Sequence, residues 1–330
     1  MKRRIFEKQR TLKKFVQHNF DWDVDGLDAY IEEQSPEIFP ELVERSPTLG
    51  YVTTMENVKG KEKIKMISTD ATLQVASACG FNATGGVILT DQTIEVERIK
   101  IEEEYCNEDL VGTWAQLVLS AGAHNQDTEM PFQDVLMSLY MKKVARRTEV
   151  LIWQGDTDSV NPDLLPIDGY IKVIDAAVGV VEANTTGVTD ITSANGMTVL
   201  RTVADAIPVK VLDEGNVKIF VGIETYRAAL NEIYDDNKFH YFRDEDISRT
   251  FVIPGKTVEV VHVEGLDGTN KIYAMPLNLT FFGTDRTGDM NDFRIWYSDD
   301  DDKIKVSIKW RVGVQIIYPE YFVKFTLTAS

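Results

Sequence analysis

The stretch Lys303–Ile316, KIKVSIKWRVGVQI, alternates polar and apolar residues over its whole length. Its even positions are all apolar, and its odd positions hold four cations, Ser307, Gly313 and Gln315. Side chains of a strand alternate between its two faces, so the pattern predicts one strand with an apolar face and a basic face. At about 3.3 Å per residue it would reach roughly 45 Å, whereas a typical strand has about five or six residues. A strand of this length indicates a broad, thin molecule.

The composition is that of an acidic globular protein. The chain has 330 residues, of which 43% are hydrophobic and 27% charged, and its formal net charge is −18. This length predicts about two units with a core of their own. The acidic balance argues against a dedicated nucleic-acid-binding protein and favours solubility. No apolar run approaches the roughly 18 residues of a membrane helix, and the basic N-terminus lacks the apolar core of a secretory signal.

Residues 1–47 predict an arm with little core of its own. Residues 1–17 are basic and carry a weak apolar stripe, which favours a short helix. Asp23 is placed to cap a second helix. Prolines then interrupt the chain at 36, 40 and 47. We expect such an arm to lie over another surface.

Residues 48–105 predict an extended loop. Short strands are expected at 49–56 and 61–68, joined by a turn around 58–60, which would place Lys59, Lys61 and Lys63 at the tip of a ribbon. A two-stranded ribbon is marginal alone in water, so we expect it to rest on a neighbouring subunit.

The next strand, expected at 92–105, changes the phase of its alternation. Ile94 and Val96 share one face, whereas Ile99 and Ile101 take the other. One extra residue shifts the side-chain pattern in this way, so the sequence predicts a β-bulge or a sharp bend near Glu97–Arg98.

A long helix is the second large element. Asn107 is placed to cap a preceding helix, and Pro131 is placed to begin the long one. Apolar residues then recur at three- and four-residue spacing to about Gln154, where Gly155 ends the pattern. At about 1.5 Å per residue this helix would extend roughly 35 Å.

Residues 169–287 have mixed patterns typical of an α+β unit inserted between the long helix and the long strand. Helices are expected at 169–178, 193–206 and 223–235, and strands at 217–222, 250–253, 257–263 and 271–275. Two further strands are expected at 292–298 and 321–327.

No catalytic, cofactor-binding or metal-binding residue is predicted. The histidines, at 18, 124, 240 and 262, have no metal-ligand spacing, and Cys79 and Cys106 are expected to be reduced thiols. The stretch from Asp156 to Asp163 resembles a calcium loop in composition, but Val160 occupies a ligand position and the terminal glutamate is missing.

Three other charged stretches have two interpretations each. His240 with its neighbouring aspartates, and the run Asp299–Asp302, are expected to be solvated loops rather than sites. The basic residues of 1–17 and of the 303–311 strand either form solvated or ion-paired faces or meet an anionic partner. The sequence leaves both interpretations open.

The order of elements is similar to that of the Hong Kong 97-type major capsid protein of tailed double-stranded DNA bacteriophages. The resemblance is carried by CGFNATGGVILTDQTIEVERIKIEEEYC (79–106) with the NEDL that follows, PFQDVLMSLYMKKVARRTEVLIWQGD (131–156), LLPIDGYIKVI (164–174) and KVSIKWRVGVQIIYPEYFV (305–323). The first looks like the return strand of the elongated loop in crAss-like and related Bacteroidetes phage capsid proteins. The others resemble the spine helix, the entry to the axial domain and the last strand of the peripheral domain.

The resemblance implies an α+β capsid fold with an N-terminal arm (1–47), an extended β-hairpin loop (48–105), a peripheral domain (106–168 and 287–330) and an axial domain (169–286). It implies a structural protein, not an enzyme, that assembles into hexamers and pentamers of an icosahedral head around the genome. Its partners would be its own copies, with portal, scaffolding and decoration proteins, and its contact with DNA would be non-specific. It would be found in the virion, after assembly in the bacterial cytoplasm, with no membrane partner and no cofactor.

Two other classes of protein stay open. An encapsulin-like compartment shell uses the same fold, and a soluble α+β enzyme or binding protein would carry a site dispersed along the sequence. The sequence does not identify a crosslinking Lys–Asn pair or a cleavage site. A separate scaffolding protein is favoured over a fused one, because the region before the loop is short.

Overall fold

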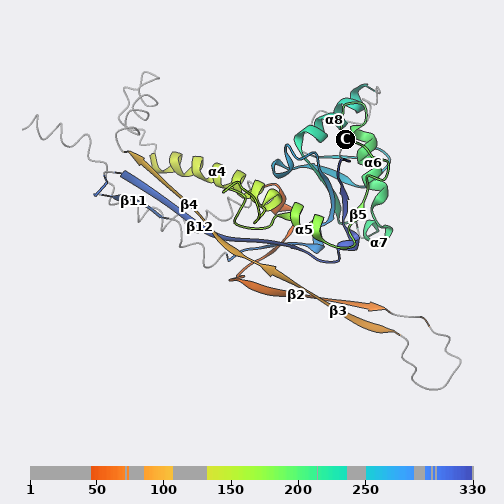
Figure 1. Ribbon diagram of the computed structural model, residues 1–330, viewed down its shortest axis with the longest axis horizontal. Helices are drawn as coiled ribbons and strands as arrows, with labels where there is room; N and C mark the ends of the chain where they lie inside the picture. Colours follow the sequence, from red (N-terminus) through yellow and green to blue (C-terminus); the bar gives the residue numbers. More distant parts are fainter. Residues whose placement is uncertain are drawn as a thin grey trace, which may run out of the picture.

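The computed structural model describes residues 46–70, 73, 85–106, 132–213, 215–235, 250–285, 294–298, 300–301 and 303–328. Figure 1 shows an elongated α+β molecule from which a two-stranded hairpin projects. The helices predicted within 1–45 and 107–131 lie outside the described residues.

The long strand is present as predicted: β12 (Lys303–Ile316) has 14 residues. Its first ten residues pair antiparallel with β4 (Glu97–Cys106), and its first five also pair with β11 (Arg294–Ser298). Its last four residues pair with β10 (Thr280–Gly283), which in turn pairs with β1 (Thr53–Met55). The strand is long because it holds several partners in succession along one five-stranded sheet.

The helix α4 (Phe132–Gln154) runs along β4 and β12 and has 23 residues (Figure 1). The apolar face of β12 packs on it, as the alternation predicts, with Ile308 and Trp310 in the same core as Val144 and Leu151. Burial of large apolar side chains of this kind stabilises a fold by about 1.5–3 kcal/mol each. Helix and strand therefore form two layers of one plate.

A second sheet has six strands in the described part of the chain. In spatial order they are β5 (Val181–Glu182), β13 (Val323–Phe325), β9 (Ile272–Pro276), β6 (Val217–Val221), β8 (Glu259–His262) and β7 (Thr250–Val252). The helices of this part are α5 (Tyr170–Ala176), α6 (Gly196–Ala206), α7 (Val209–Leu212) and α8 (Ile223–Asp235). Short 3-10 turns occupy Thr48–Gly50, Glu264–Leu266, Leu277–Leu279 and Pro319–Tyr321. The sequence predicted these elements except β5, β10, α7 and the turns.

Both faces of the second sheet are buried, which explains why its strands are almost continuously apolar. Phe220 and Tyr273 point into the core shared with α4, where Trp153 lies 5.5 Å and 6.1 Å from their ring centroids. Ile219 and Ala274, the alternate residues, belong to a second core with α6 and α8. Trp153 at the end of α4 therefore joins the plate to the second sheet.

The predicted ribbon of 49–56 with 61–68 is wrong. β2 (Lys61–Asp70) pairs instead with β3 (Gly86–Glu95), and β1 belongs to the long sheet. The predicted turn fails because Val58 is buried, and its N–H donates to the Thr284 carbonyl at 3.0 Å. Lys59, Lys61 and Lys63 consequently lie at the base of the hairpin rather than at its tip.

The predicted interruption of the 92–105 strand falls at Val96, which separates β3 from β4. At this point the chain changes partner from β2 to β12. β12 crosses the junction at Gly313, where a Cβ atom would lie 2.1 Å from the Glu95 carbonyl oxygen. Only a residue without a side chain permits this close approach.

We expect Gly313→Ala to lower the free energy of unfolding by about 1–3 kcal/mol, because the added methyl group meets backbone that cannot move freely. Urea denaturation of the unassembled protein measures this change. Gly86→Ala is the matched control within a strand, since nothing lies within 4 Å of its added Cβ. Equal loss of stability in the two variants would contradict the close crossing.

Candidate functional site

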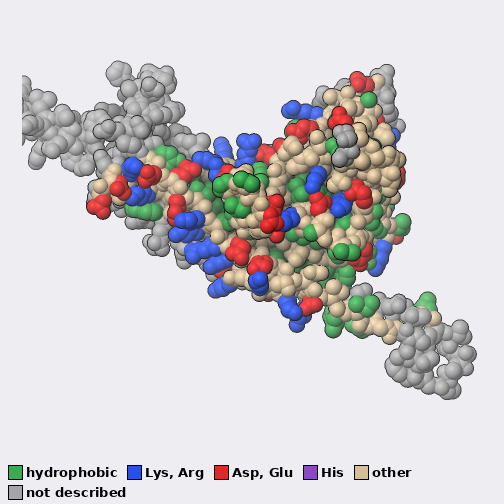
Figure 2. Space-filling model, in the orientation of Figure 1, with side chains coloured by type: hydrophobic (Ala, Val, Ile, Leu, Met, Phe, Trp, Pro, Cys, Tyr) green, Lys and Arg blue, Asp and Glu red, His purple; other side chains and the backbone are tan. Residues whose placement is uncertain are grey.

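The far end of the hairpin exposes four large apolar side chains, which we call the distal apolar patch: Ile67, Val87, Ile88 and Leu89 are 68%, 65%, 59% and 71% exposed. Ile67 lies opposite Leu89, so these two share a face with Val87, whereas Ile88 points to the other face. Figure 2 shows hydrophobic side chains on the projecting hairpin. Single exposed apolar residues are ordinary, but a cluster on a projecting element indicates a surface for a partner.

The base of the hairpin has the opposite character. Ile64 and Ile94 are buried in a small core with Val58, Val96, Phe281 and Ile317. On the outer face, Lys61 pairs with Glu95 and Lys63 with Asp91, both at 2.7 Å. The hairpin is therefore fixed to the body at one end and open at the other.

The sheet face away from α4 carries the predicted row of cations, together with Arg98 and Lys100 of β4. Arg98 lies directly opposite Arg311, and Lys100 directly opposite Lys309, and such like-charge pairs are destabilising. Acidic partners offset part of this repulsion: Lys305 pairs with Asp301, and further ion pairs join Lys303 to Glu104 at 2.6 Å, Lys100 to Glu102 at 2.6 Å and Arg311 to Asp285 at 2.7 Å. The ion-paired interpretation of this face is therefore confirmed for these residues. Figure 2 shows the Lys and Arg side chains gathered along the lower left edge, below β4 and β12.

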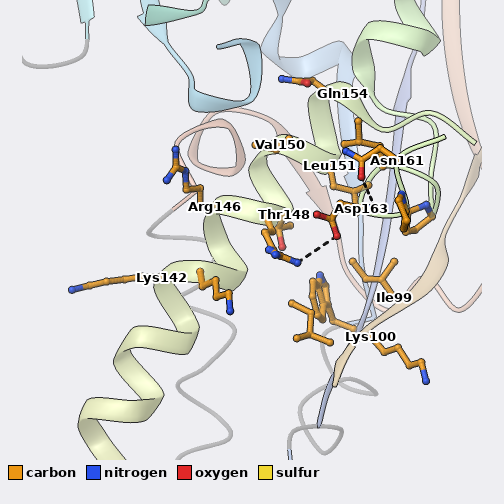
Figure 3. A pocket seen from close by; sticks show the side chains of 17 residues that line it. Ile99, Lys100, Lys142, Arg146, Thr148, Val150, Leu151, Gln154, Asn161 and Asp163 are labelled. Carbon is orange, nitrogen blue, oxygen red and sulfur yellow. Dashed lines mark hydrogen bonds and ion pairs between the residues drawn. The ribbon is translucent and has the colours of Figure 1, made fainter. Parts of the chain in front are cut away.

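A groove of about 690 Å³ lies between α4, β4 and the loop that follows α4 (Figure 3). Its apolar lining includes Ile99, Leu151 and Trp310. Its rim carries four cations and one acid on the α4 side of the sheet, Lys142, Lys143, Arg146 and Arg147 with Asp163. Figure 3 shows Lys142 and Arg146 projecting from the outer side of α4. Arg147 forms an ion pair with Asp163 at 3.4 Å. The composition of this groove suits an acidic ligand with apolar side chains.

Glu103 links β4 to α4 at the edge of the plate. Its carboxylate accepts hydrogen bonds from Tyr105 at 2.5 Å, Tyr140 at 2.8 Å and Lys143 at 2.8 Å. Burial alone would raise the pKa of Glu103, but these hydrogen bonds outweigh it and lower the pKa to about 2. No local pattern marks this cluster, because its residues on β4 lie far in the chain from its residues on α4.

Glu149 anchors the start of the described chain to α4. Its buried carboxylate accepts hydrogen bonds from the Ser46 and Thr48 hydroxyls, and the Trp153 indole N–H donates to the Thr48 oxygen at 2.7 Å. Burial raises the pKa of Glu149, and the hydrogen bonds only partly oppose that effect. Residues 46–48 are thus held against the C-terminal part of α4.

The acidic loop after α4 is neutralised by a lysine. Lys172 Nζ lies 2.6 Å, 2.8 Å and 2.8 Å from carboxylate oxygens of Asp156, Asp158 and Asp168. The hydrogen bond with Asp156, followed by those with the other two carboxylates, raises the pKa of Lys172. The loop therefore does not have the arrangement of a calcium loop.

Across the described residues, no group of three or more His, Cys, Asp or Glu side chains is arranged to hold a metal ion. His262 lies 3.2 Å from Asp267. His18, His124, His240 and its neighbouring aspartates, and Cys79 lie outside those residues. None of the described helices is long and apolar enough to cross a membrane.

No family profile and no curated protein matches this sequence. Solved structures do match. The structure titled satellite phage P4 procapsid including size determination (Sid) protein is 14% identical, with 98% of each chain covered and a TM-score of 0.61. A capsid of an empty GTA particle is 12% identical, covering 86% of this chain and 90% of that one, with a TM-score of 0.51. The capsid of cyanophage P-SCSP1u is 9% identical, covering 85% and 87%, with a TM-score of 0.51.

At these identities the likeness shows the fold. The predicted α+β fold of the Hong Kong 97 type is confirmed, and it extends over nearly the whole chain. The relation to crAss-like phages stays a prediction.

We expect Glu103→Gln to lower the free energy of unfolding by about 1–3 kcal/mol at neutral pH, because it removes charge-assisted hydrogen bonds from a partly buried group. The pKa of Glu103 is lowered on folding, so its contribution is present above its ordinary value of 4.5 and is lost as the pH falls toward about 2. Urea denaturation at a series of pH values measures this.

Glu102→Gln is the control, because Glu102 lies one residue away in an exposed ion pair with Lys100. Such exposed pairs contribute little to stability, because water and salt screen them. A difference between Glu103→Gln and the unmodified protein that stays constant from pH 7 to pH 2 would contradict the assignment.

Proposed function

We propose that this chain is the major capsid protein of a tailed bacteriophage, and that its copies form hexamers and pentamers closing an icosahedral head around double-stranded DNA. The proposal rests on the fold that the chain shares with phage capsid structures. The observation that carries it is the distal apolar patch on a hairpin that projects beyond the body.

The physical argument starts from the hairpin. A two-stranded ribbon is marginally stable when it stands alone in water, and this one exposes apolar side chains on both of its faces at its far end. Both problems are removed when the ribbon lies on another copy of the chain. A contact between a projecting element and a different surface of the next copy is head-to-tail, and such contacts close into rings when the rotation permits. Hexamers and pentamers are rings of this kind.

The division into domains is part of the proposal. The arm would be 1–47, the extended loop 48–105, the peripheral domain 106–168 with 287–330, and the axial domain 169–286. The strand pairings support two adjustments. β10, within the axial range, pairs with β12 of the long sheet, and β13, within the peripheral range, pairs with β9 of the second sheet. The two parts are therefore interleaved in sequence near their boundary.

The other partners belong to the same proposal. Portal, scaffolding and decoration proteins would bind the assembled or assembling shell, and contact with DNA would be non-specific. The net charge of −18 fits a shell that holds a polyanion without adhering to it. A structural role is supported by the fold that the chain shares with phage capsid structures.

We expect the double variant Ile67→Ser with Leu89→Ser to fold normally but to lose at least nine-tenths of its particles, because the patch contributes to contacts between copies and little to the core. Electron microscopy and sedimentation velocity count the particles, and urea denaturation measures folding. Val160→Ser is the matched control, since Val160 is 97% exposed in a loop outside the hairpin.

Ile308→Asp supplies the opposite control. It places a charge among buried apolar side chains and should remove soluble protein altogether. Normal particle yield in the double variant would overturn the role of the hairpin.

We expect purified particles to contain nuclease-protected DNA with a portal protein. Mass spectrometry and nuclease digestion of particles from infected cells test this. A shell holding a cargo enzyme and no DNA would instead support the encapsulin-like alternative, and a protein that never forms particles would favour a soluble enzyme or binding protein.

A further inference from the structure

We propose that the groove beside α4 binds the acidic segment 20–44 of its own chain. The groove and the segment lie in one polypeptide, so the inference does not depend on the proposed capsid function.

The lining of the groove contains polar groups without hydrogen-bond partners among the described residues. Thr148 and Trp310 both line it, and both are more than nine-tenths buried. The Thr148 hydroxyl and the Trp310 indole N–H nevertheless have no hydrogen-bond partner among the described residues. Buried polar groups in proteins are nearly always paired. Two unpaired groups in the lining of one groove therefore indicate a ligand that supplies polar atoms.

The charge of the groove selects an acidic ligand. Four of the five charged residues on its α4 side are cations, whereas the side chain of Lys100 points to the other face of the sheet. Lys143 and Arg147 have acidic partners in Glu103 and Asp163, and Arg146 lies 3.4 Å from Glu264 with three-quarters of its side chain exposed. Lys142 has no ion pair among the described residues and projects outward from α4 (Figure 3). The apolar lining, with Ile99, Leu151 and Trp310, requires apolar side chains in the same ligand.

Residues 20–44 have the matching composition. The stretch FDWDVDGLDAYIEEQSPEIFPELVE contains nine acidic residues and no Lys or Arg, so it carries half of the net charge of −18. It also contains four aromatic residues, Phe20, Trp22, Tyr30 and Phe39. Acidic and aromatic residues in one short stretch complement a groove that is basic at its rim and apolar in its lining.

The place where the described chain begins brings the segment to the groove. Ser46, one residue after Arg45, is held by Glu149 on α4. Arg146 and Lys142 precede Glu149 by three and seven residues and so share its side of the helix. Val150, the residue after Glu149, lines the groove, so the groove begins next to the anchor. A basic surface thus connects the anchor to the groove. Because the segment is tethered beside its site, its effective concentration is high, which favours binding within one chain over binding to a second copy.

The experiment measures the acylation rate of Lys142 by mass spectrometry in the full-length chain. In one variant, Asp21, Asp23, Asp25 and Asp28 are replaced with Asn, which removes four charges of the segment. We expect Lys142 to react at least threefold faster in this variant than in the unmodified chain, because the segment no longer covers it. The matched control replaces the same four residues with Glu, which keeps the charge and should keep the slow rate.

Two further measurements identify the source of protection. Lys59, exposed at the base of the hairpin, should react at the same rate in all three proteins, which excludes a general change of folding. Dilution of the unassembled chain over a hundredfold range should leave the rate at Lys142 unchanged. Equal rates in the Asn variant and the unmodified chain would overturn the proposal, and a rate that rises on dilution would overturn binding within one chain and assign the segment to a second copy.

Discussion

The contact between the apolar face of β12 and α4 is the interaction on which the rest of the structure depends. It fixes two long elements in parallel layers, to which several other described parts are attached. β4, β10 and β11 pair along β12. The second sheet is joined through Trp153 at the end of α4, and residues 46–48 are held by Glu149, four residues before Trp153. The burial between these two long elements therefore joins the attached parts into one plate.

The same arrangement explains why the hairpin leaves the body. β12 ends near the point where Val96 separates β3 from β4, so β3 has only its last residues over the long sheet. Beyond that point β3 finds its partner in β2 alone. Because of this change of partner, the chain leaves the long sheet and forms the projecting hairpin. The burial of Ile64 and Ile94 attaches the base of the hairpin to the body.

Sequence periodicity was sufficient to predict the bounds of elements that have one apolar and one polar face. β12 and α8 were predicted at their observed bounds, and α4 nearly so, because alternation or helical spacing persists over many residues. The ribbon at 49–68 was predicted wrongly because Val58 precedes Lys59 and Gly60, and glycine favours a turn. Only the contact of Val58 with residues more than 200 positions away shows that it is part of a core. Glu103 and Glu149 escaped prediction for the same reason: an isolated acid in a strand or helix has no local pattern that marks it as a buried acceptor.

The continuity of β3 and β4 through the single residue Val96 has a mechanical consequence. The hairpin and the central sheet share one backbone with no flexible linker between them, and Gly313 brings β12 into direct contact with that joint. A force on the free end of the hairpin is therefore carried as tension and bending into β4 and β12, rather than being absorbed by a loop. Displacement of the outer part of β2 and β3 is therefore transmitted to the central sheet.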